Sequence, residues 1–156
     1  MDFTESYLRV KKSLEAYADL KIELLPDDTS TAELAAQALG TEPGQIAKTL
    51  CFVADGEPVL VVACGDRKID TKKLARIVGA KKVRMASAEL VHEVTGFFPG
   101  GVCPFALIKE IPVYLDRSLC SYDITYIAAG TPYSALPIAA MRLEEITSGC
   151  WVEVTK

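Results

Sequence analysis

The sequence has a single histidine, His92, and its five cysteines form no C-x-x-C pair. One histidine excludes a multi-histidine metal site, and it permits a Ser-His-Asp triad only if His92 itself serves as the base. The odd number and wide spacing of the cysteines argue against disulfides and against a zinc site. We therefore expect no metal and no cofactor, and we interpret His92 as a surface residue of a helix.

The chain also lacks any apolar run of transmembrane length, and its first residues do not have the pattern of a signal peptide. Aromatic residues make up only 8% of the chain, whereas half of the 156 residues are hydrophobic. This length suits one domain with a substantial core built mainly from aliphatic side chains. We expect one cytoplasmic domain over residues 1–156, of the α/β (mixed α+β) class and without a membrane partner.

The net charge of −4 argues against nonspecific binding of nucleic acid, but the basic residues are unevenly distributed. Between positions 67 and 84 the only acidic residue is Asp70. The basic residues of this interval are Arg67, Lys68, Lys72, Lys73, Arg76, Lys81, Lys82 and Arg84. Two interpretations stay open, a solvated helix face and a basic surface that meets phosphates.

Apolar periodicity and turn signals predict a mixed order of helices and strands. Helices are expected over 4–20, 31–39, 70–77, 87–94 and 141–147, with one more helical turn over 45–48. Strands are expected over 21–25, 50–54, 58–64, 82–85, 105–108, 113–115, 124–128, 136–138 and 151–154. The capping-box signature Ser30-Thr31-Ala32-Glu33 opens the second helix, which Gly40 is expected to end. Asp70 and Ser87 are expected to cap the next two helices, and Asp55-Gly56 is a strong hairpin signal. This order predicts a mixed sheet with helices outside it.

Lys48 stands at the mouth of the strongly apolar run 49–54. An isolated charge is costly to bury, so its ammonium must stay solvated or paired while the side-chain stem lies along the core. The residue is therefore either a strand-end lysine that reaches solvent or a fixed cation for a phosphate, a carboxylate or a sugar hydroxyl. The position alone favours the first interpretation.

A glycine- and proline-rich loop occupies residues 97–104. The adjacent Gly100 and Gly101 allow backbone conformations closed to other residues, and they let a ligand approach the main-chain amides. Such a loop can present N–H groups to an anion or to a developing oxyanion, although many loops of this composition are simple turns. The chain contains neither a G-x-G-x-x-G motif nor a Walker lysine motif.

Three segments together resemble the YbaK/EbsC family, the freestanding relatives of the editing insertion domain of bacterial prolyl-tRNA synthetase. They are Thr31–Gly40 with Gln45–Leu50, Thr95–Gly96 with Gly100–Phe105, and Ala128–Gly130 with Leu136–Ile138. Their order and spacing match the family from about residue 20 to 155. The resemblance implies a single YbaK-like domain with a partly barrel-like mixed sheet flanked by helices.

The resemblance further implies a trans-editing hydrolase that deacylates mischarged aminoacyl-tRNA. Editing is needed because a pocket distinguishes side chains that differ by one methylene by only roughly 1–3 kcal/mol. The implied substrate is tRNA(Pro) carrying a small wrong amino acid, and a synthetase is an implied partner. The alternative is a catalytically inactive binding module for aminoacyl-tRNA ends, aminoacyl-nucleotides or a synthetase.

The family motif also implies a set of site residues. Lys48 matches the family's characteristic lysine, and we expect it to pair with the phosphate or a ribose hydroxyl of the terminal adenosine and to orient the ester. The Gly101 amide is the expected oxyanion donor in the G-x-x-x-P loop, with water as the nucleophile. Substrate binding is expected at Thr31, Gly100, Val102, Cys103, Pro104, Ala128 and Gly130. Contacts to tRNA are expected at Lys68, Lys72, Lys73 and Arg76.

Four positions depart from the family branches. Ala128 and Ala135 replace a serine and an aspartate of the branch that acts on cysteinyl-tRNA, Thr31 replaces a frequent aromatic residue, and Tyr133 replaces a histidine. We therefore expect a rebuilt pocket and do not transfer cysteine specificity. Cys103 has no basic neighbour in the sequence to lower its pKa, so we interpret it as a pocket wall rather than a reactive thiol.

Overall fold

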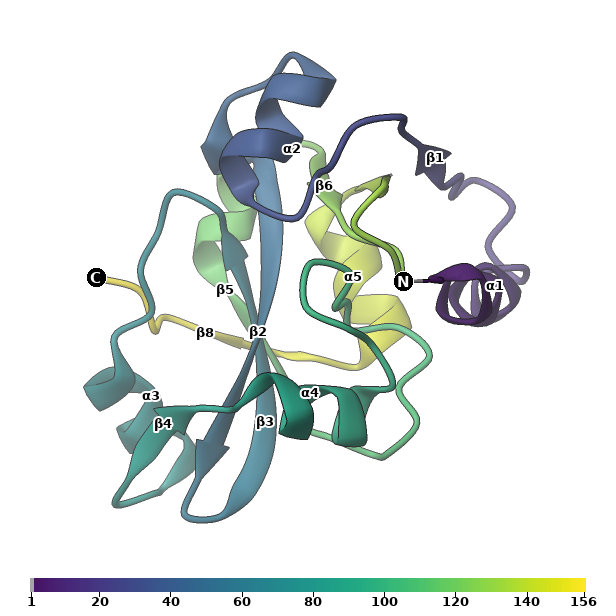
Figure 1. The fold of residues 1–156 in the computed structure, drawn as a ribbon. Helices are drawn as coiled ribbons and strands as arrows, with labels where there is room; N and C mark the ends of the chain where they lie inside the picture. The colour runs from purple at the N-terminus through teal and green to yellow at the C-terminus, as the bar shows by residue number, and fades with distance from the viewer. Residues whose placement is uncertain (1) are drawn as a thin grey trace.

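A single mixed sheet forms the centre of the computed structural model, which describes residues 2–156 (Figure 1). The strands are β1 (Glu23–Leu24), β2 (Ile46–Ala54), β3 (Glu57–Cys64), β4 (Val83–Met85), β5 (Val113–Asp116), β6 (Thr125–Ile127), β7 (Ser134–Ile138) and β8 (Cys150–Val152). The helices are α1 (Thr4–Ser13), α2 (Ala32–Leu39), α3 (Thr71–Val78), α4 (Ala88–Thr95) and α5 (Ala140–Thr147), with short 3-10 helices at Pro43–Gln45 and Arg117–Ser121.

The strand order is β1-β7-β6-β2-β3-β5-β8, with β4 attached to β2. Pairing is parallel between β2 and β6, β3 and β5, and β5 and β8, and it is antiparallel elsewhere. The expected mixed sheet with flanking helices is therefore confirmed. No helix in the described part of the chain combines the length and the apolar character needed to cross a membrane.

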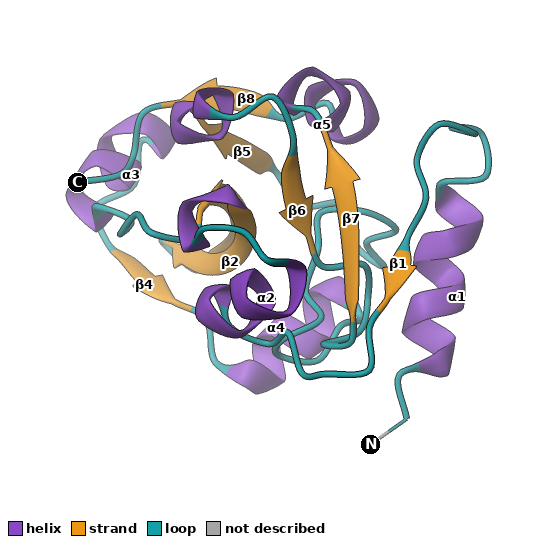
Figure 2. Cartoon of the chain, turned by 90° about the horizontal axis from the view of Figure 1, so that it is seen from above, coloured by secondary structure: helices purple, strands orange, loops and turns teal. Residues whose placement is uncertain are grey.

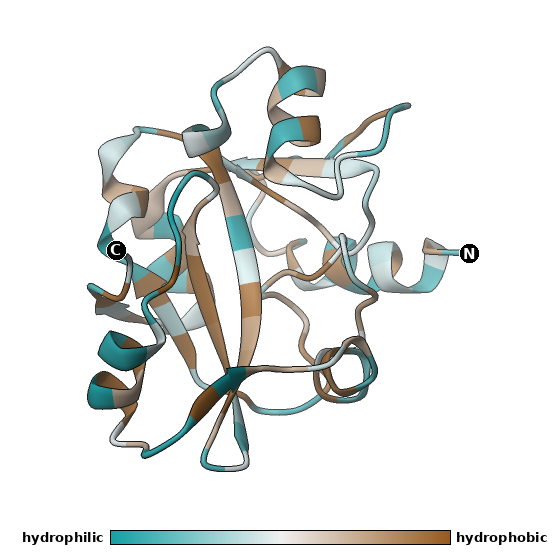
Figure 3. Ribbon diagram, turned by 60° about the vertical axis from the view of Figure 1, so that its left-hand side comes forward, coloured by the Kyte–Doolittle hydropathy of each residue, from teal (hydrophilic) through white to brown (hydrophobic). Residues whose placement is uncertain are grey.

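The long hairpin of β2 and β3 divides the core into two layers. Side chains on successive strand residues point to opposite faces, so Ala47 and Cys51 join the larger core cluster while Phe52 joins the smaller one beneath α3. The same alternation places Lys48 on the face of Phe52 and Thr49 on the face of Cys51. Figure 3 shows a hydrophilic stretch within β2, which is otherwise apolar.

The sheet has a gap beside the middle of β2. On that side β6 pairs only with Ile46 and Ala47, whereas β4 pairs with residues 52–54. Between these two pairings, the Cys51 carbonyl accepts a hydrogen bond from the Ala86 amide at 3.0 Å. Figure 2, which looks down on α2, shows this helix above one end of β2 with β6 and β7 beside it. The gap thus opens between α2, α4 and the diverging strands.

The helix boundaries follow their capping residues. The hydroxyl of Thr31 accepts a hydrogen bond from the Leu34 amide at 3.1 Å, so the capping residue of α2 is Thr31 and not Ser30. Asp70 and Ser87 cap α3 and α4 as expected. The expected hairpin turn is confirmed, because Asp55 and Gly56 have φ values of 48° and 87°.

Three local expectations were wrong. The first helix ends at Ser13 instead of reaching residue 20, and residues 46–48 begin β2 instead of forming a helical turn. Residues 105–108 form no strand, because Ala106 takes a φ of 51° that breaks the extended conformation.

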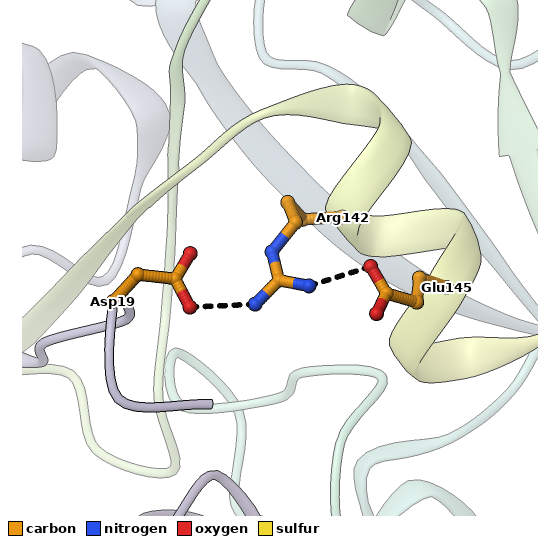
Figure 4. Close-up of polar contacts among 3 residues, drawn as sticks. All are labelled: Asp19, Arg142 and Glu145. Carbon is orange, nitrogen blue, oxygen red and sulfur yellow. Dashed lines mark hydrogen bonds and ion pairs between the residues drawn. The ribbon is translucent and has the colours of Figure 1, made fainter. Parts of the chain in front are cut away.

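Contacts with α5 hold the segment that follows α1. The Arg142 guanidinium binds the Asp19 carboxylate at 2.6 Å and the Glu145 carboxylate at 2.5 Å (Figure 4). It also lies 5.1 Å from the centroid of the Tyr17 ring. These carboxylates, Glu145 first, raise the pKa of Arg142. These contacts between distant residues hold the segment after α1 in a non-helical conformation, which the helical periodicity over 4–20 did not predict.

Candidate active site

A pocket of about 440 Å³ occupies the gap beside β2. It is lined by the start of α2, by β2, by the β4–α4 connection, by the glycine-rich loop and by β6 and β7. Five of the nine predicted catalytic and substrate-binding residues line it, and they come from all three segments of the family resemblance. These residues are Thr31, Lys48, Gly100, Val102 and Ala128.

Lys48 is a partly buried cation on the wall of this pocket. Its Nζ donates a hydrogen bond to the backbone carbonyl of Arg67, in the loop between β3 and α3. Burial lowers the pKa of Lys48, and the nearby carboxylates of Asp66 and Glu33 act in the opposite direction. The structure therefore places the ammonium at the pocket wall, held by a backbone carbonyl.

The structure does not bring the Gly101 amide to the pocket. This amide donates a hydrogen bond to the Phe98 carbonyl at 3.1 Å, and the Gly101 carbonyl accepts one from the Gly130 amide at 3.1 Å. A Cβ atom at Gly101 would lie 2.9 Å from the Thr131 nitrogen. Gly101 thus packs the glycine-rich loop against the turn after β6, and this geometry does not support the expected oxyanion donor.

Cys103 lies in the main core, with 0% of its surface exposed, so the expectation of a pocket wall was wrong. Burial raises the pKa of its thiol to about 12, which keeps the sulfur protonated near neutral pH. Pro104 and Gly130 are also buried and do not line the pocket. These three residues shape the loops behind the pocket wall.

Besides Thr31, two of the positions that depart from the family branches lie at the pocket. Ala128 and Ala135 both line the pocket, which is walled largely by small apolar side chains. Tyr133 does not line it; the residue is 42% exposed, and its ring centroid lies 6.4 Å from that of Phe3. Of the four positions that depart from the family branches, the pocket therefore includes Thr31, Ala128 and Ala135 but not Tyr133.

Sequence reasoning missed the side chains of α1 that support the pocket rim. Arg9 donates hydrogen bonds to the carbonyls of Ala106 at 2.9 Å and Thr95 at 3.1 Å, at the two ends of the glycine-rich loop. The hydroxyl of Ser6 donates to the Gly130 carbonyl at 2.7 Å. These contacts join residues 86 to 124 positions apart, so no local motif signals them.

Sequence reasoning also missed Thr49, which lines the pocket next to Lys48. Its hydroxyl oxygen is buried and has no hydrogen-bond partner among the described residues. A buried hydroxyl without a partner is unfavourable for stability. In the sequence it reads only as a β-branched strand residue, which is why it attracted no functional interpretation.

The four residues predicted to contact tRNA lie in and before α3, outside the pocket. Lys73 donates a hydrogen bond from its Nζ to the Thr155 carbonyl at 3.0 Å. Lys72 lines a second hollow, of about 510 Å³. Lys68 and Arg76 line neither hollow, and the role of all four in tRNA binding stays a prediction.

Comparison with known proteins assigns a family to this arrangement. The model of the aminoacyl-tRNA editing domain matches residues 26–146. YwhH of Bacillus subtilis is 42% identical over 130 residues, which cover 82% of each chain. EbsC of Enterococcus faecalis, named as a proposed Cys-tRNA(Pro)/Cys-tRNA(Cys) deacylase, is 34% identical over 130 residues, 83% of this chain and 79% of that one.

A solved structure has the same fold. It is described as a proposed trans-editing enzyme for prolyl-tRNA synthetase, and it superposes with a TM-score of 0.90 at 37% identity over 97% of each chain. The resemblance seen in the sequence is confirmed by these matches together with the mixed sheet. The chain belongs to the aminoacyl-tRNA editing domain family.

Proposed function

We propose that this protein hydrolyses the ester bond of mischarged aminoacyl-tRNA, acting in trans as a freestanding deacylase. The observation that carries the proposal is the pocket itself, which gathers Lys48, Thr31, Gly100 and Ala128 from distant segments. The editing-domain family and the deacylase name of the EbsC relative support the same reaction. The substrate would place its action in the cytosol, beside the translation machinery.

Lys48 supplies the cation that orients the end of the substrate. Its ammonium, held on the Arg67 carbonyl, binds the phosphate or a ribose hydroxyl of the terminal adenosine. An aminoacyl ester is already activated, so a water molecule is a sufficient nucleophile and no covalent enzyme intermediate is required. A hydroxyl of the substrate's own ribose would then activate the water.

Val102, one residue beyond Gly101, is the better candidate for the oxyanion donor. Val102 lines the pocket, and its amide donates no hydrogen bond among the described residues. The Gly101 amide, in contrast, is engaged by Phe98. We therefore assign the developing negative charge to the Val102 amide. A donor of this kind is worth about 2.7–4 kcal/mol of transition-state stabilisation where it has been tested.

The pocket walls indicate the kind of amino acid that is removed. Ala128, Ala135 and Val102 make an apolar surface, and none of the described residues that line the pocket has a carboxylate to attract a basic side chain. A small amino acid carried by tRNA(Pro) fits this surface. The names of the EbsC relative and of the solved structure connect related proteins to tRNA(Pro) and to prolyl-tRNA synthetase. A synthetase is accordingly a candidate partner.

The test is a deacylation panel with alanyl-, cysteinyl-, seryl- and threonyl-tRNA. We expect the pure protein to hydrolyse at least one of them faster than its spontaneous rate, and we expect Lys48→Ala to abolish this acceleration. If the protein hydrolysed none of the four esters faster than its spontaneous rate, the proposed enzymatic activity would be refuted. Tight binding of a nonhydrolysable aminoacyl-adenosine without turnover would favour the second candidate, an inactive binding module, which the changes at Ala128 and Ala135 motivate.

A further inference from the structure

A second hollow, the basic hollow, lies between α3, the tip of the β2–β3 hairpin and β4. It has a volume of about 510 Å³, and four of its lining residues carry positive charge: Lys72, Lys81, Lys82 and Arg84. All four are exposed. The sequence placed them in one basic run, but only the fold brings the loop and strand residues opposite the first turn of α3.

None of the four cations of the basic hollow forms an ion pair among the described residues. Among the described residues Asp55 is the only acidic one that lines the hollow, and its carboxylate accepts hydrogen bonds from the backbone amides of Lys81 at 3.0 Å and Lys82 at 2.8 Å. The ion pairs of the described residues involve only Lys109 and Arg142 as cations. Four unpaired cations around one concavity repel one another, and a bound polyanion would relieve that repulsion.

Strand β4 connects the basic hollow to the pocket. Arg84 lines the hollow, and the next residue, Met85, lines the pocket and is 58% exposed. Both residues pair with β2, opposite Val53 and Phe52. A strand of nucleic acid with its end in the pocket would therefore cross β4 to reach the four cations.

We propose that the basic hollow binds phosphates of the RNA strand whose aminoacylated end occupies the pocket. This inference rests on the proposed function, because the pocket supplies the direction of the strand. The proposal also separates the basic residues between positions 67 and 84 into those that line the hollow and those that do not. Lys72 acts together with Lys81, Lys82 and Arg84, whereas Lys73 is tied to the Thr155 carbonyl. Contacts to phosphates position the RNA and carry no base specificity.

The test compares the double variant Lys72→Gln/Lys82→Gln with the control Lys11→Gln/Lys12→Gln. The control removes the same charge from two exposed lysines on α1, away from both hollows. Each protein is assayed for binding of uncharged tRNA from low to high salt, and for hydrolysis of aminoacyl-tRNA and of a 3′-aminoacyl-adenosine. Thermal melts verify that all variants are folded.

We expect the hollow variant to bind tRNA about tenfold more weakly at low salt. The slope of log affinity against log salt should become less steep by about 1.4, since a single-strand phosphate contact contributes about 0.7. Hydrolysis of aminoacyl-adenosine should be unchanged, and the control should match the wild type in every assay.

Unchanged tRNA affinity and salt slope in the hollow variant would overturn the proposal. The proposal would also be overturned if the hollow variant lost binding of inorganic phosphate but kept its affinity for tRNA, because the hollow would then be a site for a small anion. Failure of the wild type to hydrolyse any ester would refute the proposed function, yet the binding measurement with uncharged tRNA would still decide the role of the hollow.

Discussion

The pocket and the basic hollow lie on either side of β4 and differ in the chemistry of the residues that line them. The pocket is walled by small apolar side chains and holds one cation, Lys48, on a backbone carbonyl. The hollow is rimmed by four exposed cations without ion pairs among the described residues. Salt screens the partly buried charge of Lys48 less than it screens the exposed charges of the hollow. The two regions should therefore separate the chemistry from the affinity for RNA.

The largest effect is expected for Lys48→Ala. Removal of the pocket cation should lower single-turnover hydrolysis of aminoacyl-tRNA by about 100-fold or more. An equal loss on 3′-aminoacyl-adenosine, which lacks the 5′-phosphate, would assign the cation to a ribose hydroxyl, and a smaller loss would assign it to the phosphate. The protein should stay folded, because the side chain is only partly buried. Lys21→Ala, which removes an exposed lysine outside both hollows, is the matched control. A Lys48→Ala protein with wild-type rates would remove the central residue from the proposal.

Substitution of Gly100 tests whether the shape of the pocket rim matters. Its φ is 89°, and a Cβ atom there would lie 2.8 Å from the Ser30 Cβ and 3.2 Å from the Pro132 Cβ. Gly40 also has a positive φ, of 70°, but has open space around it.

Gly40→Ala should lower the free energy of unfolding by about 1–2 kcal/mol through left-handed strain alone. Gly100→Ala should cost more than this and should also reduce hydrolysis, because Ser30 and Pro132 must move. Urea unfolding and deacylation rates check both statements. Equal losses of stability with full activity in both variants would show that the rim geometry is unimportant.

Cys103→Ala should retain full deacylation activity, because the thiol is buried behind the pocket wall. Its removal from the core should lower the free energy of unfolding by about 1 kcal/mol. A loss of activity that exceeds the loss of folded protein would instead restore a thiol-dependent mechanism.

The same variant makes a prediction about pH. The pKa of the Cys103 thiol is raised from 9.0 to about 12 by burial, so the folded state keeps a proton that the unfolded state releases. The contribution of this group to stability is complete below pH 9 and declines as the pH rises from 9 toward 12. The stability of Cys103→Ala should fall less over this range than that of the wild type.

An effect of opposite sign is expected for Thr49→Val. Its buried hydroxyl has no partner among the described residues, so the isosteric replacement should raise the free energy of unfolding by about 1 kcal/mol. Urea titration measures this gain, and Thr125→Val, which removes a buried hydroxyl bonded to the Ile138 carbonyl, is the control that should lose stability. A destabilised Thr49→Val would show that the hydroxyl is satisfied in solution.

The sequence predicted the elements whose signals are local. The Gly40 terminus of α2 and the Asp55-Gly56 turn stand where they were expected, because each depends on a few neighbouring residues, and the cap of α2 lies one residue beyond the expected Ser30. Lys48 and Gly100 could be placed together only through the family motif, since nothing local joins them.

The remaining features depend on contacts that are distant in the sequence. The turn geometry of the glycine-rich loop decides that Phe98 engages the Gly101 amide and leaves Val102 at the pocket. The anchors from Arg9 and the basic hollow likewise arise only when distant elements pack. Composition showed the basic charges, but only the fold showed which of them face the same concavity.

The most direct test measures single-turnover hydrolysis by the wild-type protein on aminoacyl-tRNA and on the matching 3′-aminoacyl-adenosine, each at low and high salt. We predict hydrolysis of both esters above their spontaneous rates. High salt should slow only the reaction of subsaturating tRNA, because only that substrate reaches the basic hollow. No acceleration of either ester, or equal sensitivity to salt for both, would contradict the division between pocket and hollow.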